Sequence, residues 1–171
     1  MPHPGGTLLE HLIRVSGRLA EWGAPRHVEI AGLCHAFYGT DGFAPTLLDV
    51  AGATDRAVLT DLIGGETEAL VYLYASCDRT ATYPRLRHRL SDPQQPVFRD
   101  RFTGTDHTPS TLDLGAFLDI TAANELDVFA HNPDLATRYG PGLHRLLEPE
   151  PVRALLSAAA WDAIRETLKP E

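Results

Sequence analysis

Residues 8–39 read LLEHLIRVSGRLAEWGAPRHVEIAGLCHAFYG and predict two consecutive helices. The first helix is expected over 8–22, because Thr7 and Glu10 have the spacing of a capping box at its start. Apolar side chains recur through it at helical spacing, and His11 falls at the edge of their stripe. We therefore expect His11 to point toward the core.

The second helix of this stretch is expected to start at Pro25 and to end before Gly39. His35 lies in the middle of its apolar run and has no acidic neighbour in the sequence. Tyr38 follows three residues later, so a helix would bring the two side chains to one face. A buried imidazole and a phenol are thus predicted to lie together.

The rest of the chain also shows mainly helical periodicity. Further helices are expected over residues 54–63 (capped by Thr54), 66–79, 111–131, 133–139 and 151–168. Between residues 80 and 109 the periodicity is lost: SDPQQP (91–96) predicts a turn, and a short hairpin could turn at Thr103–Gly104.

These patterns predict an all-α bundle of about seven helices, with one short β-hairpin as an optional addition. A length of 171 residues suits one domain, here 1–171, with a core over 7–130 and C-terminal helices over 133–168. The last helix carries apolar residues that could pair two copies into a homodimer or pack on the core of one chain.

Composition narrows the function classes. Hydrophobic residues make up 43% and charged residues 22% of the chain, as in ordinary globular domains. No apolar stretch approaches the ~20 residues that cross a bilayer, and no signal peptide is recognisable, so we expect a soluble cytoplasmic protein without a membrane partner. The formal charge of −8 disfavours nucleic acid as a binding partner. Cys34 and Cys77, in apolar surroundings, predict buried free thiols.

Three of the expected helices each carry a polar group on an otherwise apolar face. These groups are His11, His35 and the pair Asn124–Glu125. A single buried histidine is usually a hydrogen-bonded core residue, but three such helices packed together would bring their polar groups into one pocket. Burial there could shift the imidazole pKa values into a range useful for acid–base chemistry.

Two segments resemble the HD-domain superfamily: residues 8–39, with a first-helix histidine and a second one near the end of an apolar helix, and LDITAANELD (118–127). The resemblance implies a helical fold with a divalent ion that activates water for phosphate ester hydrolysis or, in a di-iron subset, oxygen chemistry. His11 and His35 match the histidine positions of the family. Ala36 and Asn124 occupy the two positions where the family has metal-binding aspartates.

The loss of both carboxylates weakens a site for an oxygen-preferring ion. Iron, zinc or manganese bound by His11, His35 and a nearby carboxylate (Asp78 or Glu125) remains an alternative to a metal-free pocket. The segment HAFYGT (35–40) is similar to one in a family of bacterial HD-like proteins without assigned chemistry.

In the metal-free interpretation, His35 is the leading general base or acid and Tyr38 stabilises an oxyanion. His11 is its partner in the opposite protonation state, and Asn124 orients the substrate. Two further candidates close the fourth helix: Asp78 as a catalytic carboxylate and Arg79 as a substrate-binding group. For both, an ordinary charged helix end is the competing interpretation.

Three hypotheses follow from the sequence. The first is a small-molecule enzyme that uses histidine acid–base catalysis (a cyclase, isomerase, lyase or hydrolase), in a pathway such as natural-product biosynthesis, with Glu125 among the substrate-binding residues. The second is a metal-dependent phosphohydrolase or iron-dependent oxygenase. The third is a non-catalytic protein that binds a ligand or a partner.

Overall fold

A computed structural model describes residues 1–88 and 96–168, and the backbone of these ranges is mostly helical. Its helices are α1 (Leu8–Glu21), α2 (Arg26–Cys34), α3 (Ala53–Ile63), α4 (Gly65–Ser76), α5 (Arg79–His88), α6 (Thr111–His131), α7 (Pro133–Leu147), α8 (Glu150–Arg153) and α9 (Ala158–Thr167). Two antiparallel strand pairs are β1 (Pro2–His3) with β2 (Gly6–Thr7), and β3 (Phe98–Arg99) with β4 (Asp106–His107). A predominantly α fold with a short hairpin around Thr103–Gly104 is confirmed.

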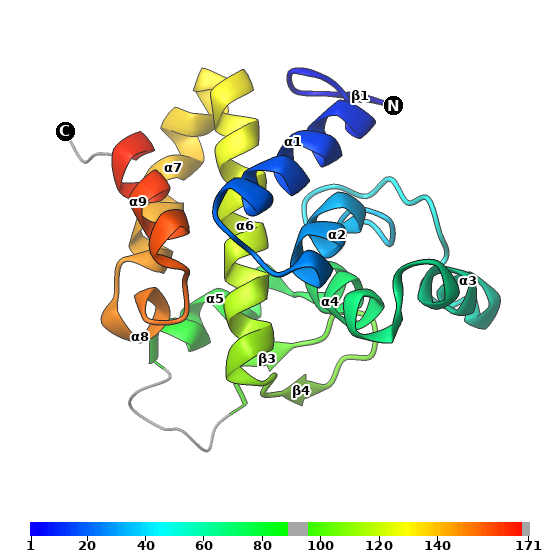
Figure 1. The fold of residues 1–171 in the computed structure, drawn as a ribbon. Coiled ribbons are helices and arrows are strands. Elements are labelled where there is room, and N and C mark those ends of the chain that lie inside the picture. Colours follow the sequence, from blue (N-terminus) through cyan, green and yellow to red (C-terminus); the bar gives the residue numbers. More distant parts are fainter. Residues whose placement is uncertain (89–95, 169–171) are drawn as a thin grey trace.

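The long helix α6 forms the centre of the molecule (Figure 1). Helices α1, α2 and α4 contact it, and α7 and α9 pack on it from the C-terminal half of the chain. Buried side chains occur on all sides of α6, as expected for a helix enclosed by others. Polar residues on α6 therefore lie between elements that are distant in the sequence.

The start of α1 agrees with the sequence prediction. The Thr7 amide donates to Glu10 Oε2 at 2.7 Å, and the Glu10 amide donates to Thr7 Oγ1 at 3.3 Å, which completes the capping box. The buried stripe of the helix is Leu8, His11, Leu12, Val15 and Leu19. His11 is thus inside the protein, as its spacing predicted.

Helix α2 ends earlier than predicted. It stops at Cys34, and tight turns follow, in which the Phe37 amide donates to the Cys34 carbonyl and the Gly39 amide to the Ala36 carbonyl. Gly39 has a φ of +70°, a conformation that glycine adopts at little cost. Because the chain turns here, residues 35–38 do not share the face that a continuous helix would give them.

Several other boundaries also differ from the prediction. Helix α3 begins at Ala53 after Gly52 rather than being capped by Thr54, and α4 ends at Ser76. Arg79 opens α5, a helix missed because its sequence is mostly polar and contains Pro84. Apart from Pro96, the turn expected at 91–96 lies outside the described residues.

The C-terminal half differs in two places. Helix α7 continues through Gly140-Pro141-Gly142, where a stop was predicted, since Leu143, Leu146 and Leu147 of its last turns are buried in the core. The single helix expected over 151–168 is divided into α8 and α9, with the Ser157 side chain capping α9. Its buried apolar residues pack within the chain, so this face is not a free surface for a second copy.

Cys34 and Cys77 are buried and free, as predicted. Burial raises the pKa values of these thiols to about 11 and about 12.

In the described ranges, no helix combines the length and the apolar character that a bilayer span requires.

Candidate active site

A cavity of about 680 Å³ lies between the N-terminal hairpin, α1, α5, α6, α7 and the turn after α2. Its lining includes five of the side chains that the sequence singled out: His11, His35, Arg79, Asn124 and Glu125. The volume is in the usual range for sites that enclose a small molecule. The predicted convergence of polar groups from separate helices is therefore present.

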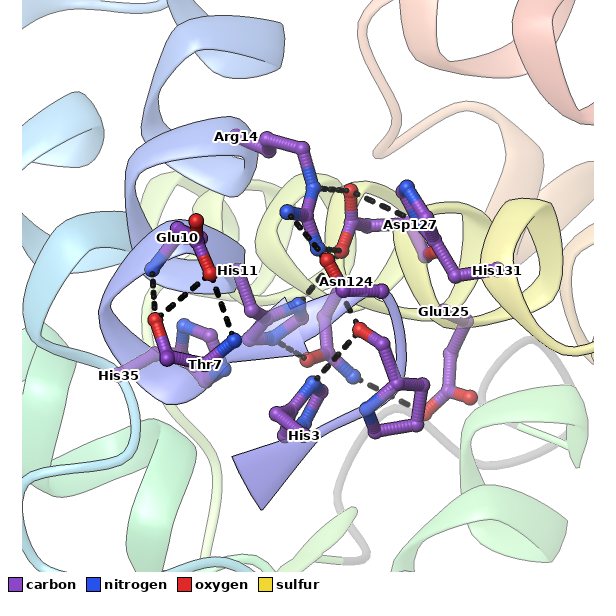
Figure 2. Close-up of polar contacts among 12 residues, drawn as sticks. His3, Thr7, Glu10, His11, Arg14, His35, Asn124, Glu125, Asp127 and His131 are labelled. Atoms are coloured by element: carbon purple, nitrogen blue, oxygen red, sulfur yellow. Dashed lines mark hydrogen bonds and ion pairs between the residues drawn. The ribbon is translucent and has the colours of Figure 1, made fainter. Parts of the chain in front are cut away.

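His11 is almost fully buried and has an oxygen atom at each ring nitrogen (Figure 2). Nδ1 lies 2.7 Å from Asp127 Oδ2, and Nε2 lies 3.0 Å from Asn124 Oδ1. The two partners are three residues apart on α6 and thus share one face of that helix. The ring is held between a buried carboxylate and an amide that lines the cavity.

Arg14 also binds Asp127. Arg14 donates from Nε to Oδ1 at 2.7 Å and from Nη2 to Oδ2 at 2.9 Å, a two-pronged pairing that fixes the plane of the carboxylate. Burial by itself would raise the pKa of Asp127, but hydrogen bonds from His11 and Arg14 outweigh it and hold the pKa well below its usual range. Asp127 is thus a permanent anion that orients the His11 ring.

The hydrogen bond that His11 Nε2 can make on the cavity side depends on whether the ring is protonated. With Nδ1–H donating to Asp127, the charged ring can also donate from Nε2 to the Asn124 oxygen. In the neutral ring, Nε2 is an acceptor, and it needs a donor from a reoriented Asn124 amide or from a bound molecule. A ligand group that takes the place of the Asn124 oxygen at Nε2 can therefore exchange a proton with His11.

His35 has a different environment, although its ring is next to His11. Its Nδ1 lies 2.7 Å from the Gly32 carbonyl oxygen, so Nδ1 carries the proton and Nε2 the lone pair. Burial lowers the pKa of His35 to about 3, which outweighs the effect of the Gly32 hydrogen bond. His35 is therefore a neutral hydrogen-bonding group at neutral pH, with its ring centroid 5.4 Å from that of His11.

A third imidazole, His3, comes from the N-terminal hairpin and lines the same cavity. Its ring stacks on His11 with centroids 4.0 Å apart and an interplanar angle of 25°. Burial, followed by the nearby His11, lowers the pKa of His3. His3 was not among the sequence-based candidates, although the turn-forming Pro4-Gly5-Gly6 sequence is a signal that could have revealed the hairpin.

Arg79, Glu125 and Tyr83 are also polar residues of the cavity lining. Arg79 Nη1 lies 3.0 Å from Glu125 Oε1, and Nη2 donates to the Tyr74 hydroxyl at 3.2 Å. The Tyr83 hydroxyl is buried and has no hydrogen-bond partner among the residues that the structure describes. Burial raises the pKa of Tyr83, so this group stays a neutral phenol.

Two predicted catalytic residues lie elsewhere. The Tyr38 hydroxyl donates to Glu68 Oε1 at 2.9 Å, and its ring lines a smaller, separate cavity of about 260 Å³. Asp78 Oδ1 accepts from the Ala81 amide at 2.9 Å, as a residue that caps the start of α5. Neither side chain lines the cavity with the histidines, because the chain turns after Cys34 and again after Ser76.

Four residues of the site were missed by the sequence analysis: His3, Arg14, Tyr83 and Asp127. Asp127 had a usable signal, since it lies three residues after Asn124 and hence on the same helix face. Arg14 had the same signal relative to His11. Tyr83 had none, because α5 itself was not recognised.

The donor atoms near the histidines do not fit a divalent ion in this arrangement. Within the described ranges, no three His, Cys, Asp or Glu side chains lie in positions to hold a metal together. Both nitrogens of His11 and Nδ1 of His35 already have partners, and Ala36 supplies no ligand. The metal-free interpretation and the metal-dependent alternative both stay predictions.

Comparison with known proteins adds one match. Residues 1–79 match a domain family of unknown function, DUF6817. No curated protein matches the chain. No solved structure matches it either. The matched part contains His3, His11, His35 and Arg79 but not α6, which supplies Asn124 and Asp127. The relation to the HD-domain superfamily stays a prediction.

Proposed function

We propose that this protein is an enzyme that converts a small organic molecule by acid–base catalysis at His11. The observation that carries the proposal is the buried Asp127–His11 pair in the wall of a cavity large enough for such a molecule. A carboxylate on Nδ1 fixes the tautomer and orients the ring, so that Nε2 can take up a proton and return it.

The other groups of the cavity have supporting roles in this proposal. The Asn124 amide can donate to or accept from an oxygen of the substrate next to His11 Nε2. His35, neutral at physiological pH, offers a lone pair on Nε2. The leading role thus passes from His35 to His11, because only His11 has a carboxylate partner. Reactions that need one proton moved between two atoms, as in isomerases, lyases and cyclases, suit this arrangement.

The test is a search for turnover with a matched inactive variant. Purified protein and its His11→Gln variant are incubated with fractionated bacterial metabolites, and mass spectrometry follows compounds that are consumed or formed. We expect at least one compound to change with the wild-type protein and about 100-fold more slowly with His11→Gln. Compounds that bind and are recovered unchanged from both proteins would contradict catalysis and favour a ligand-binding protein.

A further inference from the structure

The lining of the cavity combines a small set of polar side chains with many apolar ones. The imidazoles, Asn124 and Tyr83 are among the polar groups. Apolar side chains come from the hairpin, α1, the turn after α2, α6 and α7: Pro2, Pro4, Leu8, Ala36, Phe43, Val128, Phe129, Leu135, Leu143 and Leu146. A ligand that fills this space needs a mainly hydrocarbon body with few polar atoms.

The guanidinium in the lining is already paired within the protein. Arg79 is the only Arg or Lys among the described lining residues, and its guanidinium binds Glu125 at 3.0 Å. Asp41 accepts the backbone amide of Arg79 at 2.8 Å and forms no ion pair among the described residues, so it adds a second negative charge to the lining. An anionic ligand at Arg79 would therefore lie beside the Glu125 carboxylate, and burial of an ion without an opposite charge is unfavourable.

The hydrogen-bonding groups that remain open are uncharged. His35 keeps a lone pair on Nε2, and the Tyr83 hydroxyl is buried without a partner in the described part of the chain. A buried hydroxyl that makes no hydrogen bond costs about 1–3 kcal/mol, a cost that a ligand oxygen near it would remove. The unpartnered hydroxyl is thus independent evidence for a ligand oxygen near it.

We infer that the cavity takes a molecule without an anionic group, with a hydrocarbon body and a carbonyl or hydroxyl oxygen near the Tyr83 hydroxyl, and not a phosphate ester or a carboxylate. The inference concerns the cavity of the proposed function and names the class of substrate for it. It rests on the pairing of Arg79 with Glu125, the apolar side chains of the lining and the unpartnered hydroxyl.

The test compares ligands that share one skeleton and differ in the polar group. The probes are 2-acetylnaphthalene, 2-naphthoate and 2-naphthyl phosphate, titrated into the full chain at pH 7.5 and followed by NMR. We expect the neutral ketone to bind at least tenfold more tightly than each of the two anions. Equal or tighter binding of either anion, or no binding of the ketone, overturns the inference.

Two variants test the residues that carry the argument. Tyr83→Phe should weaken 2-acetylnaphthalene at least fivefold and change 2-ethylnaphthalene, which has no oxygen, less than twofold. Glu125→Gln frees Arg79 and should strengthen 2-naphthyl phosphate at least fivefold. Equal losses for both neutral probes, or unchanged phosphate affinity, contradict the assignment.

The outcomes separate this inference from the proposed function. A protein that prefers the ketone but converts no compound in a His11-dependent way would contradict the enzyme and leave the ligand class in place. A protein with His11-dependent turnover that prefers the phosphate would contradict the ligand class and leave the proposed enzyme in place.

Discussion

Two buried carboxylates in this protein have nearly the same surroundings. Asp127 accepts two hydrogen bonds from Arg14 and a third from His11, all between 2.7 and 2.9 Å. Glu68 accepts two hydrogen bonds from Arg56, at 2.8 and 2.9 Å, and a third from Tyr38 at 2.9 Å. We call the two groups the Asp127 cluster (Arg14, His11, Asp127) and the Glu68 cluster (Arg56, Tyr38, Glu68).

The difference lies in the third donor. A phenol has one polar atom, and in Tyr38 the bond to Glu68 occupies it. An imidazole has two, and His11 uses one on Asp127 while the other faces Asn124 at the cavity. The same buried ion pair therefore holds the fold together in one place and, we propose, supports proton transfer in the other.

The largest expected effect separates the clusters by activity. Asp127→Asn and Glu68→Gln should each lower the free energy of unfolding by roughly 3 kcal/mol. Each change removes a buried negative charge that binds an arginine. With a substrate found as above, only Asp127→Asn should also reduce turnover, by about 100-fold, because His11 loses its orienting anion. Denaturant unfolding and steady-state rates measure both. Equal losses of activity in the two variants would contradict the distinction.

The second prediction concerns how the free energy of unfolding depends on pH through His35, which lines the cavity. The pKa of His35 is about 3 in the folded protein, below its ordinary 6.5, so between these values the unfolded chain binds more protons. The free energy of unfolding should therefore fall as the pH falls below 6.5, by up to about 1.4 kcal/mol per pH unit for this group. Asp127 contributes nothing above pH 5, because its carboxyl is ionised in both states.

Urea unfolding at pH 6.5 and 5 measures this dependence. His35→Asn keeps a donor for the Gly32 carbonyl and has no titrating ring, so its stability should decline by about 1–2 kcal/mol less than that of the wild type over this interval. Parallel declines in the two proteins would show that His35 is not held neutral by the fold.

The third prediction tests whether the N-terminal hairpin belongs to the Asp127 cluster. Gly5 has a φ of +77°, and a Cβ there would lie 2.4 Å from the ring of His131. Gly5→Ala should lower the free energy of unfolding by about 1–2 kcal/mol and displace His3 from His11, with a several-fold loss of turnover. Thermal unfolding and rate measurements follow both effects.

A matched glycine serves as the control. Gly17 lies in α1, and a Cβ added there would have no atom within 4 Å. Gly17→Ala should raise the free energy of unfolding by roughly 0.5–1 kcal/mol and leave turnover unchanged. If Gly5→Ala behaves like Gly17→Ala, the hairpin does not contribute to the site.

The smallest effect is expected in the Glu68 cluster. Tyr38→Phe removes one of three hydrogen bonds to Glu68, and the Arg56 pairing remains. The free energy of unfolding should fall by about 1 kcal/mol, as measured by urea titration. A loss of turnover without this loss of stability would return Tyr38 to the active site and break the comparison between the clusters.

Local features of the sequence predicted the parts of the fold that depend on neighbouring residues. The capping box at Thr7 and Glu10 located the start of α1, and helical periodicity placed α6 at residues 111–131. Helical spacing also placed His11 on a buried face. These signals involve residues within one or two helical turns. They can therefore be recognised without knowing which elements pack against the helix.

The errors occur where contacts across the fold outweigh local preference. Helix α7 continues through Gly140-Pro141-Gly142 because its last turns are buried in the core. Tyr38 points away from His35 because the turn after α2 directs it to Glu68, 30 positions later in the chain. Neither outcome can be read from the residues adjacent to it.

The sequence by itself determined a helical protein with inward-facing histidines on its first helix and at the end of its second. Only the tertiary structure decided which of them has a carboxylate, since Asp127 is 116 positions from His11 and the packing of α6 against α1 brings them together. It also decided that His3 joins them and Tyr38 does not. The physical reason is that helix formation depends on near neighbours, whereas the surroundings of a buried side chain depend on elements that the chain brings from far away.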